Sequence, residues 1–337
     1  MTRSIGQGHA ARGVIGGCHD SAARKGLTTR PRRRMIMLPR LRGRISLMPF
    51  RFKKKESVAK AVRRLCSERL EDALETLEKA ARFEAVHGVR KEIKKLRSVL
   101  RLTRGEIGKK TYQRHNQVLR EAADLLTAFR DAQVKLSAFD DLSSHFKGKL
   151  PLHSEIKNAL RDNCRAEEKK LSVAIAPLKA ILSESKEELD SLKLKTKGWR
   201  AIGPGLKKVY GRGQAAFETI GGEPSDHNFH EWRKRVKDLG YHLSLLYPAR
   251  PRKLRDCTGK LEKLGDLLGD DHDLFMLREF VIKKFPRTHD TNAFELMIFA
   301  RQRELRSAAV KLGGRFYREK PNRFSRRIGD YWKRWRR

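Results

Sequence analysis

One pattern occurs twice in this chain of 337 residues, and it limits the possible folds more than any other feature. Residues 86–102 and 229–245 align without a gap at an offset of 143, with seven identities in seventeen positions. The identities include a His-x-x-Arg-Lys-x-x-Lys series that begins at His87 and again at His230. Residues three and four apart lie on one side of a helix. Each copy therefore predicts a helix with a ridge of basic side chains, and the repeat predicts two copies of one helical unit.

Helical periodicity extends through most of the remaining chain. Apolar residues recur every three to five positions, and no convincing alternating strand pattern occurs. A second pair of segments, 126–131 and 268–273, repeats at an offset of 142. We therefore expect an all-α fold, a duplicated four-helix bundle with two pseudo-symmetric halves at about residues 48–196 and 197–315. The expected helices span residues 57–82, 85–104, 111–143 and 153–191, then 205–220, 226–247, 252–285 and 290–314.

Glycine and proline mark the expected interruptions of these helices. Gly198, Gly203, Pro204 and Gly205 predict the break between the two halves. Pro177 lies inside the segment 153–191 and is expected to bend that helix, because proline lacks a backbone donor.

The two ends of the chain differ from its body. Residues 1–47 hold eleven basic residues and a single acid, without helical periodicity, and are expected to be disordered. They resemble either an organelle transit peptide or translated upstream sequence, since Met35, Met37 and Met48 could each start the chain. The basic segment 316–337 is expected to dock on the bundle as a short amphipathic helix. Contact with nucleic acid or with an anionic membrane is the alternative for this segment.

Charge restricts the partners of the chain. Seventy-eight lysines and arginines stand against 40 acidic residues, for a net charge of +38. Such a chain favours polyanions: nucleic acid, inorganic polyphosphate or an anionic membrane surface. The four cysteines are far apart, which indicates neither a zinc site nor a disulfide framework and fits a reducing cytoplasm. No apolar run reaches the roughly 18 residues that cross a bilayer.

The direction of the first ridge follows from its periodicity. Val86, Val89, Ile93, Leu96 and Leu100 form one stripe, which is expected to face the core. No acidic residue lies on the opposite arc, whereas a solvated helix face usually mixes both signs of charge. A plain solvated face is the alternative, but the uncompensated charge favours anion binding. The arc carries His87, Arg90, Lys91, Lys94, Arg97 and Arg101.

The second ridge has the same form with less charge. Trp232, Val236, Leu239 and Leu243 form its apolar stripe. Gly240 and Ser244 stand where the first copy has two arginines, while Tyr241 could donate a hydrogen bond to phosphate. We therefore expect one uneven anion site in which the first half contributes more. The second arc carries His230, Arg233, Lys234 and Lys237, again without an acid.

These motifs together resemble the CHAD domain family, which is named for conserved histidines in an α-helical domain. The resemblance covers roughly residues 48–337 and rests on segments 87–97, 130–131, 207–210, 230–239 and 264–274. It implies a basic groove or pore between the two halves that binds inorganic polyphosphate, association with polyphosphate granules, and no catalysis by the domain itself. The chain departs from the family at Gly211, Gln214 and Gly240, where larger or basic residues are common.

We therefore hypothesise a non-catalytic, cytoplasmic polyphosphate-binding protein. Sequence-independent nucleic-acid binding is the alternative, but the two arcs carry few of the aromatic residues on which single-stranded bases stack. Most contacts are assigned to Arg90, Lys91, Lys94, Arg97, Arg233, Lys234 and Lys237. Further hydrogen bonds are assigned to His87, His230 and Tyr241, and secondary contacts to Arg101, Arg130, Lys207, Lys208 and Arg212.

The run Asp270-Asp271-His272-Asp273 raises two further hypotheses, a metal site and a metal-dependent phosphohydrolase with a His-Asp pair. Adjacent residues on a helix point in different directions, so only Asp270 and Asp273 share a face. A structural role that orients ridge side chains is expected for Asp131 and Asp273 instead. No catalytic residue, metal ligand or cofactor is therefore assigned.

Overall fold

The computed structural model describes residues 50–79 and 82–337, so the expected disorder of residues 1–47 lies outside the described residues. The described chain is helical and contains no strand, which confirms the all-α class. The helices are α1 (Val58–Lys79), α2 (Arg82–Leu102), α3 (Lys109–Asp124), α4 (Thr127–His145), α5 (His153–Asp190), α6 (Trp199–Gly222), α7 (Asp226–Leu246), α8 (Pro251–Lys284), α9 (His289–Phe316) and α10 (Pro321–Arg336). A short 3₁₀ turn, η1 (Tyr247–Ala249), joins α7 to α8.

The single helix expected over residues 111–143 is wrong, because the chain forms two helices, α3 and α4, that meet at residues 125–126. The side chains of Arg90 and Thr127 both donate hydrogen bonds to the Ala123 carbonyl, which lies in the last turn of α3. Leu126 is fully buried at the junction. Side-chain donors and apolar burial therefore stabilise the interruption between α3 and α4, although the sequence has no glycine or proline at this point.

The break expected at Gly198, Gly203, Pro204 and Gly205 is confirmed at Gly198 and wrong at residues 203–205, because α6 begins at Trp199 and continues through Pro204. Gly198 precedes the helix with a φ of 60°. Inside α6, Gly205 lies against α2: a Cβ atom there would be 1.9 Å from the carbonyl oxygen of Leu102. Glycine is required at this position because α6 and α2 are in close contact, and not because a helix ends there. α5 continues through Pro177 as one helix, as expected, and the bend at Pro177 stays a prediction.

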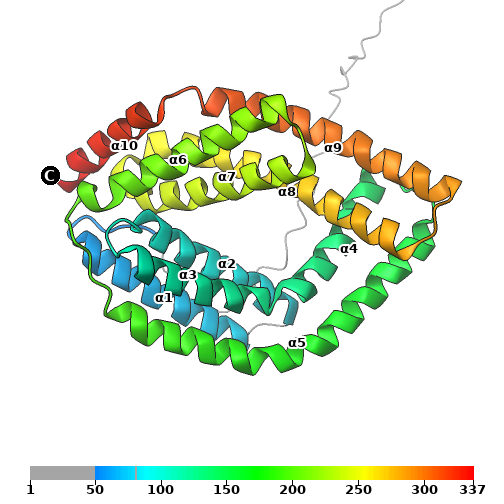
Figure 1. The fold of residues 1–337 in the computed structure, drawn as a ribbon, viewed down its shortest axis with the longest axis horizontal. Helices are drawn as coiled ribbons and strands as arrows, with labels where there is room; N and C mark the ends of the chain where they lie inside the picture. Colours follow the sequence, from blue (N-terminus) through cyan, green and yellow to red (C-terminus); the bar gives the residue numbers. More distant parts are fainter. Residues whose placement is uncertain (1–49, 80–81) are drawn as a thin grey trace, which may run out of the picture. The chain divides into compact units, whose positions relative to one another are not determined.

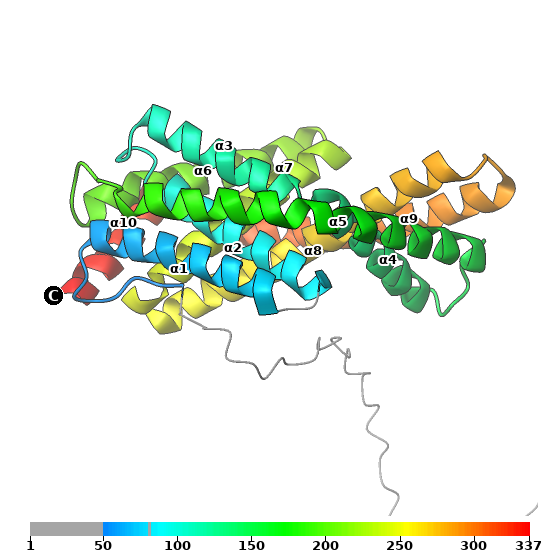
Figure 2. The ribbon, with the colours of Figure 1, turned by 90° about the horizontal axis from the view of Figure 1, so that it is seen from below.

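The two ridge helices, α2 and α7, are in direct contact with each other. Figure 1 shows α1–α3 and α5 on one side and α6–α8 with α10 on the other, and Figure 2 shows α4, α5, α8 and α9 extending to the same end. α2 also packs on α1, α3 and α6, while α7 packs between α6 and α8. Each ridge helix is the second helix of its half, as the repeat predicts, although the duplication itself stays a prediction.

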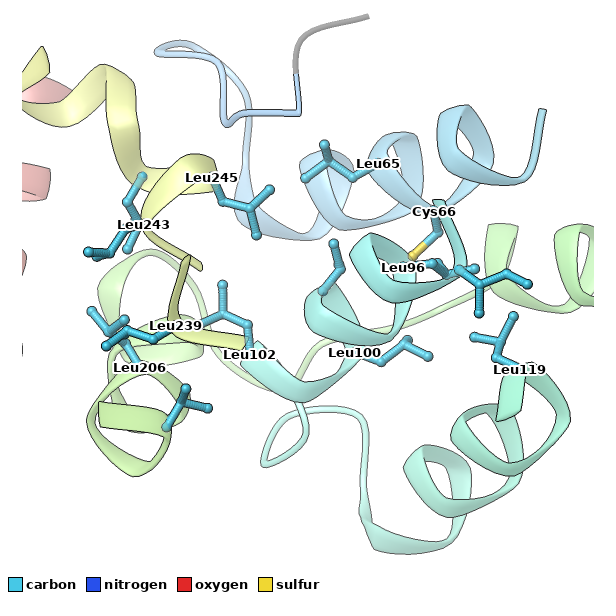
Figure 3. Close-up of a cluster of buried hydrophobic side chains, with 14 of the residues drawn as sticks. Leu65, Cys66, Leu96, Leu100, Leu102, Leu119, Leu206, Leu239, Leu243 and Leu245 are labelled. Atoms are coloured by element: carbon cyan, nitrogen blue, oxygen red, sulfur yellow. The ribbon is translucent and has the colours of Figure 1, made fainter. Parts of the chain in front are cut away.

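A large apolar core holds the two ridge helices in place (Figure 3). Leucines of α2, such as Leu96 and Leu100, and of α7, such as Leu239 and Leu243, belong to one buried cluster. All residues of the two predicted stripes are buried, so the predicted orientation of both ridges is confirmed. Each such leucine contributes about 1.5–3 kcal/mol by burial. A second cluster joins α4, α5, α8 and α9 and includes Phe139.

A buried polar contact adds to the junction between α2 and α7. Nε2 of His242 on α7 lies 2.9 Å from the carbonyl oxygen of Ser98 on α2. A carbonyl only accepts, so Nε2 carries the proton and donates. Burial lowers the pKa of His242 to about 3, which keeps the ring neutral. The relative position of the two ridges is thus set by apolar packing and by this hydrogen bond.

The C-terminal segment forms α10, which packs against α6 and η1. Phe324, Ile328 and Trp332 are buried at that contact, four residues apart on one face. The rings of Phe324 and Tyr210 stack with centroids 4.0 Å apart. No helix in the described part of the chain is long and apolar enough to cross a membrane.

Candidate anion-binding site

Basic side chains of both ridges converge around Lys94. This residue is exposed on α2, yet its pKa is lowered to about 7. Desolvation contributes most to the shift, followed by the positive charges of Arg90, Arg130, Arg233 and Lys237. These four cations come from α2, α4 and α7. Charge from both copies of the repeated pattern therefore acts on the ammonium group of Lys94. We call Lys94, Arg90, Arg130, Arg233 and Lys237 the central cluster.

Two histidines, His87 on α2 and His230 on α7, lie beside the central cluster. Desolvation and nearby cations lower the pKa of His87, and lower that of His230 to about 4. Both rings are therefore neutral near pH 7, as expected from the basic surroundings, and each retains one N–H donor. The ring of His230 lies against that of His272, with centroids 4.0 Å apart, a pairing that the sequence pattern did not reveal.

Acidic residues, some of them on other helices, lie close to the basic side chains. Arg130 lies 2.9 Å from Asp131 and 3.5 Å from Asp273, and Lys237 lies 3.3 Å from Asp266. The prediction that the ridge charges lack acidic partners is therefore wrong for both ridges, because Lys237 on α7 pairs with Asp266 and Arg101 on α2 pairs with Asp238. The reason is geometric: the periodicity of one helix cannot show which carboxylates a neighbouring helix supplies. Asp131 and Asp273 contact a cationic side chain, in line with the structural role expected for them.

Lys91 and Lys94 differ from the other ridge lysines. Among the described residues, no carboxylate lies within ion-pair distance of either ammonium group. Lys234, by contrast, lies 2.5 Å from Glu231 on its own helix. Both α2 lysines are also exposed. The α2 ridge therefore presents the positive charge that the protein itself compensates least.

Two buried guanidinium nitrogens point to an acceptor that the described residues do not provide. Nε of Arg90 and Nε of Arg233 are buried without a hydrogen-bond partner in that part of the chain. The Nη1 atom of Arg90 does have partners, including the Thr127 hydroxyl at 2.8 Å. A buried donor without an acceptor costs roughly 1–3 kcal/mol. One such donor on each ridge fits a site whose ligand supplies oxygen acceptors.

Glycines of α8 make room for the α7 ridge. A Cβ atom at Gly265 would lie 2.9 Å from Nζ of Lys237, and one at Gly269 would lie 3.7 Å from Nε of Arg233. The long basic side chains of α7 therefore lie across these two glycines. The G-x-x-x-G spacing on α8 was the available signal, but it acquires this meaning only once α8 is known to pack beside α7.

The two additional arginines of the first ridge have hydrogen-bond or ion-pair partners outside the central cluster. Arg101 pairs with Asp238 on α7, and burial raises the pKa of that carboxyl group. The Nε atom of Arg97 donates to Asn116 at 3.1 Å. The structure thus engages both arginines in contacts within the protein. Arg97 and Arg101 therefore help to hold α2 against its neighbours, so their charge is only partly available to a ligand.

The candidates on α6 divide between two sides of that helix. Lys208 and Arg212 are exposed, and the charge of Arg104 contributes to a lowered pKa of both. They extend the group around Arg101 from α2 to α6. Lys207 stands one turn from Gly211, which lies against Pro321 at the start of α10. Lys207 therefore lies on the α10 side of α6, apart from both groups.

Tyr241 lies half-buried between charged groups of α2 and α7. Its ring meets that of Phe50 edge-on, with centroids 6.3 Å apart. Desolvation and the nearby carboxylates of Glu92 and Asp238 raise its pKa to about 12. The phenol therefore keeps its proton at neutral pH and is able to donate it in a hydrogen bond. The charge of Arg233 also acts on Tyr241, which places this ring beside the central cluster.

The acidic run on α8 is divided among different partners. Asp271 binds Nε of Arg306 at 2.6 Å, the ring of His272 lies tilted against that of His230, and Asp273 faces Arg130. Within residues 50–79 and 82–337, no group of three or more His, Cys, Asp or Glu side chains is placed to hold a metal ion. The structure therefore offers no support for the metal and phosphohydrolase hypotheses at this run.

The family model of the CHAD domain matches residues 55–281, which is more than half of the chain. This chain belongs to the CHAD domain family. The resemblance inferred from the two ridges is thus confirmed. Helices α9 and α10 lie beyond the residues that the CHAD model matches.

Solved structures share the fold at low sequence identity. PptA from Streptomyces chartreusis is 16% identical, with a TM-score of 0.57 over 78% of this chain and 98% of that one. The CHAD domain from the plant Ricinus communis is 15% identical, with a TM-score of 0.47 over 78% of this chain and 92% of that one. No curated protein sequence matches the chain. At such identities the likeness to PptA supports the fold alone.

Proposed function

We propose that this protein binds inorganic polyphosphate, without transforming it, at the central cluster and the adjoining ridge residues, and that binding targets it to polyphosphate granules. The observation that carries the proposal is the convergence of cations from α2, α4 and α7 on Lys94. Membership of the CHAD domain family, for which the resemblance implies polyphosphate binding, supports the same ligand. The wider ridge includes His87, Lys91, His230, Lys234 and Tyr241, with Arg97, Arg101, Lys208 and Arg212 beyond them.

The chemistry of the cluster suits a linear phosphate chain. Arginine guanidinium groups bind phosphate oxygens through two parallel hydrogen bonds, and lysine supplies a compact charge on a flexible stem. The unpartnered Nε donors of Arg90 and Arg233 would each gain an acceptor. The clustered cations repel each other in the free protein, and this repulsion destabilises the folded state. A bound polyanion offsets that repulsion.

The scarcity of aromatic side chains at this site favours polyphosphate over single-stranded nucleic acid as its ligand. Tyr241 is the single aromatic residue among the ridge candidates, and its ring packs against Phe50. Base recognition in single strands relies on exposed rings that stack with bases. The central cluster is thus built to bind phosphate groups rather than bases.

A competition experiment tests this assignment. Labelled long-chain polyphosphate is bound to the full chain and then titrated with unlabelled polyphosphate or with single-stranded DNA at equal phosphate concentration. We expect polyphosphate to displace the label at a concentration at least about tenfold lower than DNA does, because DNA brings bases that the site cannot stack. Equal or better displacement by DNA would contradict the proposal.

The pKa of Lys94 predicts a dependence of binding on pH. The protonated ammonium binds the anion, so affinity is highest below pH 7 and falls as Lys94 loses its proton. For a pKa of about 7, the affinity at pH 8 should be about tenfold lower than at pH 6. The pKa of His230 is about 4, so that group remains neutral across this range.

Replacement of Lys94 with arginine provides the matched control, because a guanidinium stays protonated throughout this range. Lys94→Arg should flatten the fall in affinity between pH 6 and pH 8. Calorimetry in buffers of different ionisation enthalpy should show an uptake of about one proton per bound site at pH 8 in the natural chain and less in the variant. An identical pH profile in both proteins would show that Lys94 does not contact the ligand.

A further inference from the structure

Helix α10 carries a second basic surface, separate from the central cluster. Its apolar face is buried, and α6 lies between α10 and the α7 ridge, packing against both helices. Figure 1 shows α10 at one edge of the described unit, beside α6. The other face of α10 is exposed and largely basic. Its exposed basic residues are Arg323, Arg326, Lys333 and Arg334.

The charge of this face is only partly compensated. Glu319 lies 2.6 Å from Arg327 and 3.9 Å from Arg323. In the part of the chain that the structure describes, no carboxylate lies within ion-pair distance of Arg326, Lys333 or Arg334. The face therefore presents three basic side chains that are available to a polyanion.

Aromatic and guanidinium groups alternate here, unlike at the central cluster. The guanidinium groups of Arg250 and Arg327 lie 5.5 Å and 6.0 Å from the centroid of the Tyr331 ring. A shallow depression of about 380 Å³ beside this ring is lined by Arg326, Asp330 and Arg334, among others. Planar guanidinium groups stack on bases as well as bind phosphate, and a carboxylate can accept hydrogen bonds from base amino groups.

We propose that the outer face of α10, with Tyr331 and Arg250, binds single-stranded nucleic acid independently of the polyphosphate site. Unstacked bases would pack beside Tyr331 and the arginine planes, while Arg326, Lys333 and Arg334 bind the backbone phosphates. A duplex keeps its bases stacked within the helix and offers phosphates alone. A membrane is disfavoured because the apolar residues that would insert, Phe324 and Trp332, are buried against the body of the protein.

The test compares two charge-reversed variants of the full chain in binding to a labelled oligouridylate. Arg326→Glu with Arg334→Glu removes two exposed basic groups of α10, neither of which has an ion-pair partner in the described structure. We expect this variant to lose at least about tenfold in affinity, with a salt-dependence slope smaller by about 1.4. Its affinity for polyphosphate and its thermal unfolding should be unchanged. The matched control is Arg303→Glu with Lys311→Glu, an equal charge change on exposed positions of α9.

A substitution that leaves the charge unchanged tests whether the surface binds nucleic acid in particular or any polyanion. Tyr331→Leu retains the apolar packing but removes the ring, and should weaken oligouridylate binding about fivefold or more. A duplex of equal length should bind more weakly than the single strand. Unchanged oligouridylate affinity in the α10 variant, equal binding of duplex and single strand, or binding to anionic vesicles without binding to RNA would each overturn the proposal. These outcomes leave polyphosphate binding at the central cluster unaffected.

Discussion

Replacement of Lys91 and Lys94 with glutamate is expected to lower the affinity for polyphosphate by about two orders of magnitude or more. Each lysine lost removes a charge-assisted hydrogen bond worth about 1.5–3 kcal/mol. Each glutamate introduced also repels the ligand. Both residues are exposed, so the folded state should persist, and binding is measured by titration of labelled polyphosphate.

The corresponding pair on the second ridge should matter less. Lys234 and Lys237 already have carboxylate partners at 2.5 and 3.3 Å, so they give up existing contacts when they bind a ligand. We expect Lys234→Glu with Lys237→Glu to lower the affinity by about tenfold, since breaking those contacts offsets part of the gain. Arg303→Glu with Lys311→Glu controls for the change in net charge. If the α7 pair mattered as much as the α2 pair, the inference of unequal ridges would be wrong.

Arg90 is less suitable for such a test, although it lies within the central cluster. Its guanidinium binds the Ala123 carbonyl and the Thr127 hydroxyl at the junction of α3 and α4. A glutamate there would remove these bonds and leave the carbonyl group without one of its donors. Loss of binding in an Arg90 variant would therefore mix a local structural effect with loss of a ligand contact. The lysines separate the two effects.

The sequence was sufficient to orient the ridges. Val89, Leu96 and Trp232 recur at helical spacing, and burial of such a stripe determines the direction of the opposite arc. Burial of apolar side chains is the main driving force of folding, so its periodicity is a reliable guide. The convergence of both ridges was suggested by the repeat, and the contact between α2 and α7 agrees with it.

The sequence did not reveal which charges the fold compensates. Asp238 on α7 pairs with Arg101 of the other ridge. Asp266 likewise reaches Lys237 from α8. Ion pairs depend on a few ångströms of separation between helices, and no pattern within one helix contains that information. The same limitation hid the pairing of His230 with His272.

A glycine in a helical sequence predicts a break, but two physical uses of glycine look alike in a sequence. A glycine can bound a helix, or it can let two helices approach closely. Gly198 does the first, with a φ of 60°, and Gly205 does the second. Only the position of α2 distinguishes them, which is why the sequence predicts too late a start for α6.

Replacement of Gly205 with alanine should therefore destabilise the protein, although alanine is the better helix former. A Cβ atom at this position would lie 1.9 Å from the carbonyl oxygen of Leu102 and 2.7 Å from its carbonyl carbon. Backbone atoms cannot rotate away, so α2 and α6 must separate and lose packing around Leu206. We expect a loss of about 3 kcal/mol or more in the free energy of unfolding, measured by chemical denaturation.

Gly240→Ala supplies the matched comparison, since it lies in α7 and a Cβ atom there would meet nothing within 4 Å. Helix propensity alone then decides the outcome, and the variant should gain up to about 1 kcal/mol. The two substitutions are chemically identical, so the opposite signs isolate the effect of the close contact between helices. A gain in stability from Gly205→Ala would mean that α2 and α6 lie farther apart than described, and the packing that holds the α2 ridge beside α7 would have to be reconsidered.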